Sequence, residues 1–148
     1  MMRALRVLLV DDDPLDRLMA EEAFALLEQP CTLETAHSGL AALTQLQRPG
    51  AVLPDVVLLD LNMPGLNGFE VLATLKGLPQ LRALPVVILT TSANPGDMTQ
   101  AQTLQASGYL IKSIHFQTFF QQIEKFIDVW LQSQRAMIGM NVGESRAM

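Results

Sequence analysis

Several residue types are scarce in this 148-residue chain, and each scarcity excludes a class of protein. Cys31 is the only cysteine, which excludes an intrachain disulfide and a cysteine-based zinc site. Lysine and arginine number 10 against 15 acidic residues and form no basic block, so we expect no DNA partner. The apolar runs are far shorter than the roughly 20 residues that span a membrane. Met1–Val10 also lacks a signal-peptide pattern, so we expect a cytoplasmic protein without a membrane partner.

The remaining composition is that of one globular domain. Hydrophobic residues make up 49% of the chain and charged residues 17%, which allows a sizeable core and argues against wholesale disorder. We expect residues 1–133 to form this domain. Residues 134–148 contain Gly139, Gly143 and mixed polar residues, and we expect them to form a frayed C-terminal tail.

Short apolar runs alternate with longer segments along the chain. The runs are rich in Val, Ile and Leu and mostly lack polar alternation, which is typical of strands buried on both faces of a parallel sheet. We predict strands at Leu5–Val10, Leu33–Ala36, Val56–Leu59, Val86–Leu89 and Tyr109–Ile111. Helical spacing predicts helices that begin at Pro14 and span Gly39–Leu46, Phe69–Lys76, Pro95–Ala106 and His115–Gln132. Ser38 can cap the second of these helices and Asn67 the third. This alternation predicts an α/β fold, a doubly wound five-stranded parallel sheet with helices on both faces.

Polar clusters follow three of the predicted strands. Asp11, Asp12 and Asp13 follow the first strand, Asp60 follows the third, and the hydroxyl cluster 90–92 follows the fourth. Ligands of open α/β sheets bind outside the carboxyl ends of the strands. If the first and third strands are neighbours, their carboxylates converge there. Each aspartate taken alone could equally cap the next helix, and Asp13 before a proline is the clearest case.

Clustered carboxylates repel one another unless a cation lies between them. Oxygen ligands with room for water suit Mg²⁺, which also neutralises an incoming phosphoryl group. Asp60 could then act as a carboxylate nucleophile and form an acyl phosphate. Lys112 follows the fifth strand at the same edge, where its ammonium could pair with a carboxylate or a phosphoryl oxygen.

Four segments, each at a strand end, resemble the signature regions of response regulator receiver domains. They are Val7–Asp13, Leu59–Gly65, Leu89–Ser92 and Tyr109–Lys112. The resemblance extends from about Leu5 to Leu131. It implies the flavodoxin-like receiver fold and a two-component phosphorelay regulator, phosphorylated by a histidine kinase, that signals by conformational change rather than as an enzyme.

The resemblance also implies the metal site. Asp60 corresponds to the phosphoacceptor. Asp12 and Asp60 correspond to direct Mg²⁺ ligands, Asp11 acts through water, and Asn62 offers its backbone carbonyl.

The remaining site residues correspond to the switch of the family. Thr90 corresponds to the hydroxyl that bonds the phosphoryl group, and Lys112 to the lysine that contacts another phosphoryl oxygen. Tyr109 matches the aromatic residue that turns inward when the threonine moves. Two positions depart from the pattern: Ser113 replaces the usual proline, and Thr91 is larger than the usual Ala or Gly. We therefore expect either a trans Lys112–Ser113 bond with a shifted loop or a strained cis bond.

Within the family, the chain is most similar to single-domain regulators that serve bacterial phytochrome histidine kinases. The similarity lies in the longer connection 77–85, in Leu89–Ser92 and in the lysine–serine pair. It implies a bacteriophytochrome as a candidate partner kinase.

Two other functions remain open from the residues. The pair Asp60 and Asn62 loosely resembles the aspartate-nucleophile phosphatases, although that class needs an acid where Asn62 stands. The chain could also be a phosphorylation-incompetent pseudo-receiver that only binds proteins, against which the intact pocket residues argue.

The last predicted helix carries a wide apolar face. Its arc of roughly 140° exceeds the ~100° that packing on one side of a sheet requires. The face consists of Phe116, Phe119, Phe120, Ile123, Phe126, Ile127, Trp130 and Leu131, and the segment after it adds Met137, Ile138 and Met140. Because aromatic residues are enriched in interface cores, we predict a homodimer through this helix. A generously buried helix is the alternative.

Overall fold

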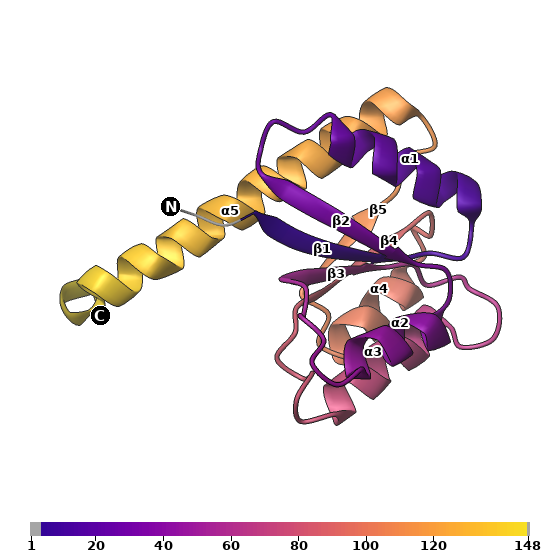
Figure 1. Ribbon diagram of the computed structural model, residues 1–148, viewed down its shortest axis with the longest axis horizontal. Coiled ribbons are helices and arrows are strands. Elements are labelled where there is room, and N and C mark those ends of the chain that lie inside the picture. Colours follow the sequence, from indigo (N-terminus) through magenta and orange to yellow (C-terminus); the bar gives the residue numbers. More distant parts are fainter. Residues whose placement is uncertain (1–3, 148) are drawn as a thin grey trace.

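The computed structural model describes the backbone of residues 4–147 and the side chains of residues 4–133. Five strands form one parallel sheet of order β2-β1-β3-β4-β5, with helices on both faces (Figure 1). The doubly wound fold expected from the sequence is confirmed. In chain order the elements are β1 (Leu5–Val10), α1 (Pro14–Ala25), β2 (Cys31–Ala36), α2 (Gly39–Gln47), β3 (Val56–Leu59), α3 (Gly68–Gly77), β4 (Val86–Thr90), α4 (Pro95–Thr103), β5 (Gly108–Ile111) and α5 (Phe116–Ala147).

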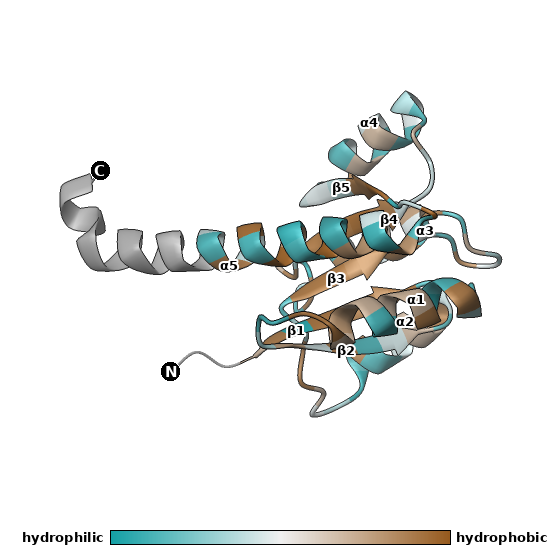
Figure 2. Cartoon of the chain, turned by 90° about the horizontal axis from the view of Figure 1, so that it is seen from above, coloured by the Kyte–Doolittle hydropathy of each residue, from teal (hydrophilic) through white to brown (hydrophobic). Residues whose placement is uncertain are grey.

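The central strands divide their side chains between two cores. Val57 and Leu59 of β3 point to the core beneath α2, α3 and α4, whereas Val56 and Leu58 point to the core beneath α1 and α5. All four side chains are buried, which explains why β3 shows no polar alternation. The edge strand β2 differs, because its residues alternate between half-buried and exposed up to the buried Ala36. Figure 2 shows the same contrast as brown central strands between helices of mixed colour.

The capping residues expected from the sequence are present at the helix starts. The Asp13 side chain accepts a hydrogen bond from the Leu15 N–H at 2.9 Å, so Asp13 caps α1. Asn67 and Glu70 form a reciprocal capping box at the start of α3. These caps fix where α1 and α3 begin, and both helices begin directly beside the carboxyl edge of the sheet.

Helix α4 is weakly packed. Ala101 is its only buried residue, and Figure 2 shows the helix as mostly pale or teal. It ends at Thr103, three residues earlier than expected. Gln105 follows with a φ of +67°, a left-handed conformation in which the backbone turns back toward β5.

The expected end of the last helix is wrong. We expected α5 to stop at Gln132 and a frayed tail to follow, but α5 continues to Ala147 and extends past the sheet (Figure 1). The segment contains no proline, and its Ala, Met, Gln, Glu and Arg residues favour a helix despite Gly139 and Gly143. Met137, Ile138 and Met140 lie outside the residues whose side chains are described. Within the described residues, no helix is long and apolar enough to cross a membrane.

Candidate functional site

The first and third strands bring the acidic residues together. Val10 of β1 pairs with Leu59 of β3, so Asp11 and Asp60, which follow them, are neighbours at the carboxyl edge of the sheet. The Asp60 N–H extends the ladder by donating to the Val10 carbonyl at 3.0 Å. One carboxylate oxygen each from Asp11, Asp12 and Asp60 lies within 4.8 Å of the others. The predicted convergence of these three residues is therefore observed.

A close backbone contact holds Asp60 in place. Gly68, the first residue of α3, lies so near that a Cβ atom there would stand 2.3 Å from the Asp60 carbonyl oxygen. The Gly68 N–H also donates to the Leu61 carbonyl at 3.1 Å. Only glycine fits this contact, and through it the start of α3 fixes the loop that carries Asp60.

Both inner carboxylates are poorly solvated. Asp11 is 1% exposed and Asp60 is 7% exposed. Burial raises the pKa of Asp60 above its ordinary value, and the negative charge of Asp11 raises it further, while Lys112 and the Thr90 hydroxyl oppose the shift. Burial also raises the pKa of Asp11, against the hydrogen bond from Lys112. The positive and hydrogen-bonding groups of the protein therefore do not fully balance the negative charges of Asp11 and Asp60.

Lys112 reaches the pocket from the end of β5, as predicted. Its Nζ lies 2.8 Å from Asp11 Oδ2 and 2.8 Å from Asp16 Oδ2. Burial by itself lowers the pKa of Lys112, but the hydrogen bonds to these two carboxylates outweigh it and hold the pKa above the ordinary value. The lysine is therefore a charged ammonium bound between β1 and α1, and Asp60 acts on it only as a nearby charge.

The loop after Lys112 is held by a side chain of α5. The Gln122 amide accepts from the Ser113 N–H at 3.0 Å and donates to the Ile111 carbonyl at 2.7 Å. No cis peptide bond occurs within residues 4–147, so the Lys112–Ser113 bond is trans. Because Ser113 has the N–H that proline lacks, Gln122 can fix the backbone on both sides of the lysine.

Thr90 and Tyr109 lie on the adjacent strands β4 and β5, where Tyr109 pairs with Ile88, two residues before Thr90. Thr90 ends β4 and is fully buried. Tyr109 of β5 is half-buried, and its hydroxyl donates to the Ser92 carbonyl at 2.9 Å. The tyrosine hydroxyl is thereby tied to the loop between β4 and α4. Thr91, which directly follows Thr90, is exposed.

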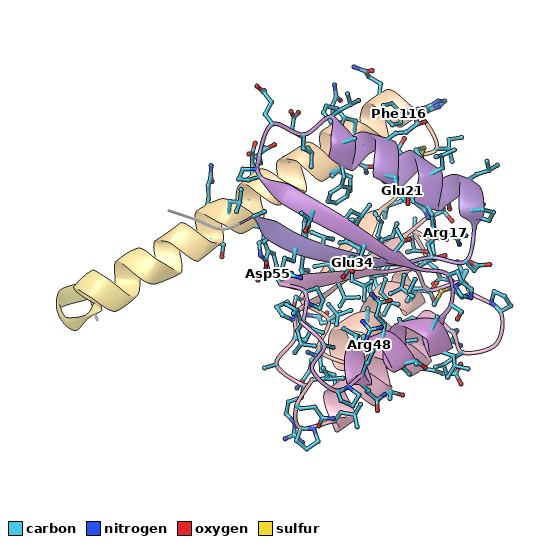
Figure 3. All side chains as sticks on the ribbon, in the orientation of Figure 1. Arg17, Glu21, Glu34, Arg48, Asp55 and Phe116 are labelled. Atoms are coloured by element: carbon cyan, nitrogen blue, oxygen red, sulfur yellow. The ribbon has the colours of Figure 1, made fainter. Side chains whose placement is uncertain are left out.

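Sequence reasoning missed three residues of this region. Asp16 and Arg17 lie in the first turn and a half of α1, and the Arg17 guanidinium donates to the Asp11 carbonyl at 2.8 Å (Arg17 is labelled in Figure 3). Gln122 is the third. Asp16 carried a usable signal, because it is an acid in the first turn of a helix that begins at the pocket. Gln122 carried none in its local sequence.

The cluster of three carboxylates fits a hard divalent cation. Asp11, Asp12 and Asp60 offer only oxygen ligands, and their charges exceed the single ammonium of Lys112. Asn62 follows on the same loop, with its N–H 3.4 Å from Asp60 Oδ1. A bound Mg²⁺ would supply the missing positive charge and polarise phosphoryl oxygens.

Comparison with known families agrees with this geometry. The sequence matches the family model of the response regulator receiver domain over residues 7–124. The chain belongs to this family, and it is a receiver domain of the two-component signalling type.

Among its relatives are single-domain regulators. The response regulator Rcp1 of a Synechocystis species is 35% identical over 131 residues, which cover 86% of this chain and 89% of Rcp1. FilR2 of Methanothrix harundinacea, a probable methanogenesis regulatory protein, is 36% identical over 133 residues, which cover 88% of this chain and 86% of FilR2. The phosphorylated cyanobacterial phytochrome response regulator RcpA superposes with a TM-score of 0.81 at 34% identity, covering 88% and 96% of the two chains. Rcp1 has also been solved in a Mn²⁺-bound form.

Proposed function

We propose that Asp60 is the sole phosphoacceptor of this receiver domain and that Mg²⁺ assists the transfer. The observation that carries the proposal is the placement of the buried Asp60 carboxylate beside those of Asp11 and Asp12. An oxygen of Asp60 attacks the phosphorus of a phosphohistidine, the P–N bond breaks, and the leaving imidazole nitrogen takes a proton from water. Asp12 and Asp60 would ligate the ion directly, Asp11 would act through water, and Asn62 would offer its carbonyl.

Thr90, Lys112 and Tyr109 convert the new phosphoryl group into a change of shape. The Thr90 hydroxyl bonds one phosphoryl oxygen and the Lys112 ammonium bonds another. Because Tyr109 is anchored on the loop that Thr90 begins, a movement of the threonine shifts the loop and the tyrosine together. Helix α4 is weakly held and follows. Phosphorylation thus biases an equilibrium between two conformations.

Intact mass spectrometry tests the phosphoacceptor. Incubated with acetyl phosphate and Mg²⁺, the protein should gain the mass of one phosphoryl group, and EDTA should abolish the gain. The Asp60→Asn variant should gain none, whereas Asp128→Asn, an exposed control on α5, should behave like the wild type. A gain by Asp60→Asn would show that another residue accepts the group, and turnover of a generic phosphomonoester would favour a phosphatase instead.

We also propose a histidine kinase of the phytochrome type as the phosphodonor. The proposal rests on the similarity to Rcp1 and to the phytochrome regulator RcpA. Incubated with an autophosphorylated bacteriophytochrome kinase, the protein should remove label from the kinase within minutes, and Asp60→Asn should not. Transfer from unrelated kinases at the same rate would contradict the specificity.

A homodimer through α5 is the third part of the proposal. The buried residues of the predicted apolar face are Phe119, Ile123, Ile127 and Leu131, while the other aromatic residues are only half-buried. Beside them, Leu110, Gln122, Lys125, Phe126 and Val129 line a groove of about 320 Å³. Val129 is 56% exposed there, and an isologous contact would cover it.

Light scattering at tens of micromolar tests the dimer. A mass of about twice 16.3 kDa is expected. The Val129→Lys variant should be monomeric because it places a second positive charge in the groove, beside Lys125, while Gln117→Lys, exposed outside the groove, should stay dimeric. A monomeric wild type, both alone and with beryllofluoride as a phosphoryl mimic, would contradict the dimer.

A further inference from the structure

Lys112 has a second anion partner on α1. Asp16 Oδ2 lies 2.8 Å from the Nζ atom, the same distance as Asp11 Oδ2. The Lys112 side chain is 5% exposed, and that of Asp16 is 31% exposed, so one face of this contact reaches the rim of the pocket. The ammonium therefore donates two of its three N–H groups to these two carboxylates.

The usual role of an acid at this position does not account for the contact. Asp16 lies in the first turn of α1, where a negative charge interacts favourably with the helix dipole. The capping hydrogen bond, however, already comes from Asp13, and it leaves the Asp16 carboxylate free for Lys112. Nothing in the helix start requires Asp16 to bind the lysine.

The hydrogen bonds of the lysine go to the carboxylates beside β1 and α1 and not to the phosphorylation site. Nζ has hydrogen bonds to Asp11 and Asp16, whereas Asp60 affects it only through its charge. A phosphoryl group on Asp60 must obtain its hydrogen bond from the same ammonium. Asp16 adds one more negative charge beside it, which opposes the arrival of a doubly charged phosphoryl group.

We propose that Asp16 is a positioning residue that competes with the phosphoryl group for the Lys112 ammonium. It holds the lysine on the α1 side while Asp60 is free and thereby slows phosphorylation. This inference rests on the proposed roles of Asp60 and Lys112. Asp11, which is more deeply buried, keeps the lysine in the pocket when Asp16 releases it.

The Asp16→Asn variant tests the competition, because it keeps the shape and removes the charge. Phosphorylation by acetyl phosphate with Mg²⁺ should be about threefold to fivefold faster than in the wild type, which is the upper part of the range for a partly exposed ion pair. The affinity for beryllofluoride should increase by a similar factor. The matched control is Glu22→Gln, which removes the same charge from an exposed position of α1 and should leave both values unchanged.

A double-mutant cycle shows whether Asp16 acts through the lysine. In a Lys112→Gln background, Asp16→Asn should change the phosphorylation rate by less than a factor of about 1.5. A purely structural role would alter the unfolding temperature but not this coupling. Asp16→Ala, tested in parallel, gives the same comparison should the amide variant fold poorly.

Three outcomes would overturn the inference. They are an unchanged rate in Asp16→Asn, a slower rate, and an equal acceleration in the Lys112→Gln background. These outcomes are distinct from a failure of the proposed function, in which the wild type itself would not be phosphorylated on Asp60.

Discussion

The Asp60 carboxylate should cost the metal-free protein part of its stability. Asp60 and Asp11 are buried, with carboxylate oxygens no more than 4.8 Å apart. Two negative charges at that separation repel by about 3.5 kcal/mol at an effective dielectric constant of about 20 and by about 1 kcal/mol in water. The hydrogen bonds of Lys112 go to Asp11 and Asp16, so they offset only part of the repulsion at Asp60.

The Asp60→Asn variant should therefore be more stable than the wild type in EDTA. A gain of about 1–3 kcal/mol corresponds to roughly 3–10 °C in unfolding temperature for a chain of this size. Thermal unfolding followed by circular dichroism at pH 7.5 measures it. Added Mg²⁺ should stabilise the wild type more than the variant, because the variant lacks a ligand and binding adds to stability. Glu22→Gln is again the control and should not gain.

The sign of the pH dependence follows from the raised pKa values of Asp60 and Asp11. A carboxyl group whose pKa is higher in the folded protein binds protons more readily there than in the unfolded chain. Its contribution to stability is therefore lost as the pH rises from the ordinary carboxyl pKa through the raised one, and regained as the pH falls. The advantage of Asp60→Asn should shrink as the pH falls from 7.5 toward the ordinary carboxyl pKa. A variant less stable than the wild type in EDTA, or an advantage independent of pH, would refute this reasoning.

Three further substitutions have defined expected outcomes. Gly68→Ala places a Cβ 2.3 Å from the Asp60 carbonyl oxygen, so it should cost about 2–4 kcal/mol in urea unfolding and slow phosphorylation, while Gly77→Ala, which meets open space, should do neither. Gln105→Gly should raise the free energy of unfolding by about 1 kcal/mol, because glycine adopts the left-handed φ without strain; a loss of stability would contradict this. Gln122→Ala removes both hydrogen bonds that flank Lys112, so it should cost about 1–2 kcal/mol and slow phosphorylation, and a rate equal to the wild type would show that the loop needs no such support.

The sequence by itself determined the sheet and the acidic end of the pocket. Buried parallel strands have a local sequence signal, because a short run of Val, Ile and Leu such as Val56–Leu59 is too short for a helix and is typical of a buried strand. A residue directly after such a strand lies at the carboxyl edge whatever else the fold does. Asp11 and Asp60 could therefore be placed before their neighbours were known, and the caps at Asp13 and Asn67 were equally local.

Only the tertiary structure decided which groups surround Lys112. Asp16 and Lys112 are 96 residues apart in sequence, and their contact exists because α1 begins and β5 ends beside the same pocket. Gln122 reaches the lysine loop because α5 packs against the sheet next to β5. The length of α5 was also misjudged. Its two glycines predicted an earlier end, whereas the other residues of the segment favour a helix and the helix continues. Local patterns give the strand ends, but partners distant in sequence depend on how the helices pack, which a single segment does not encode.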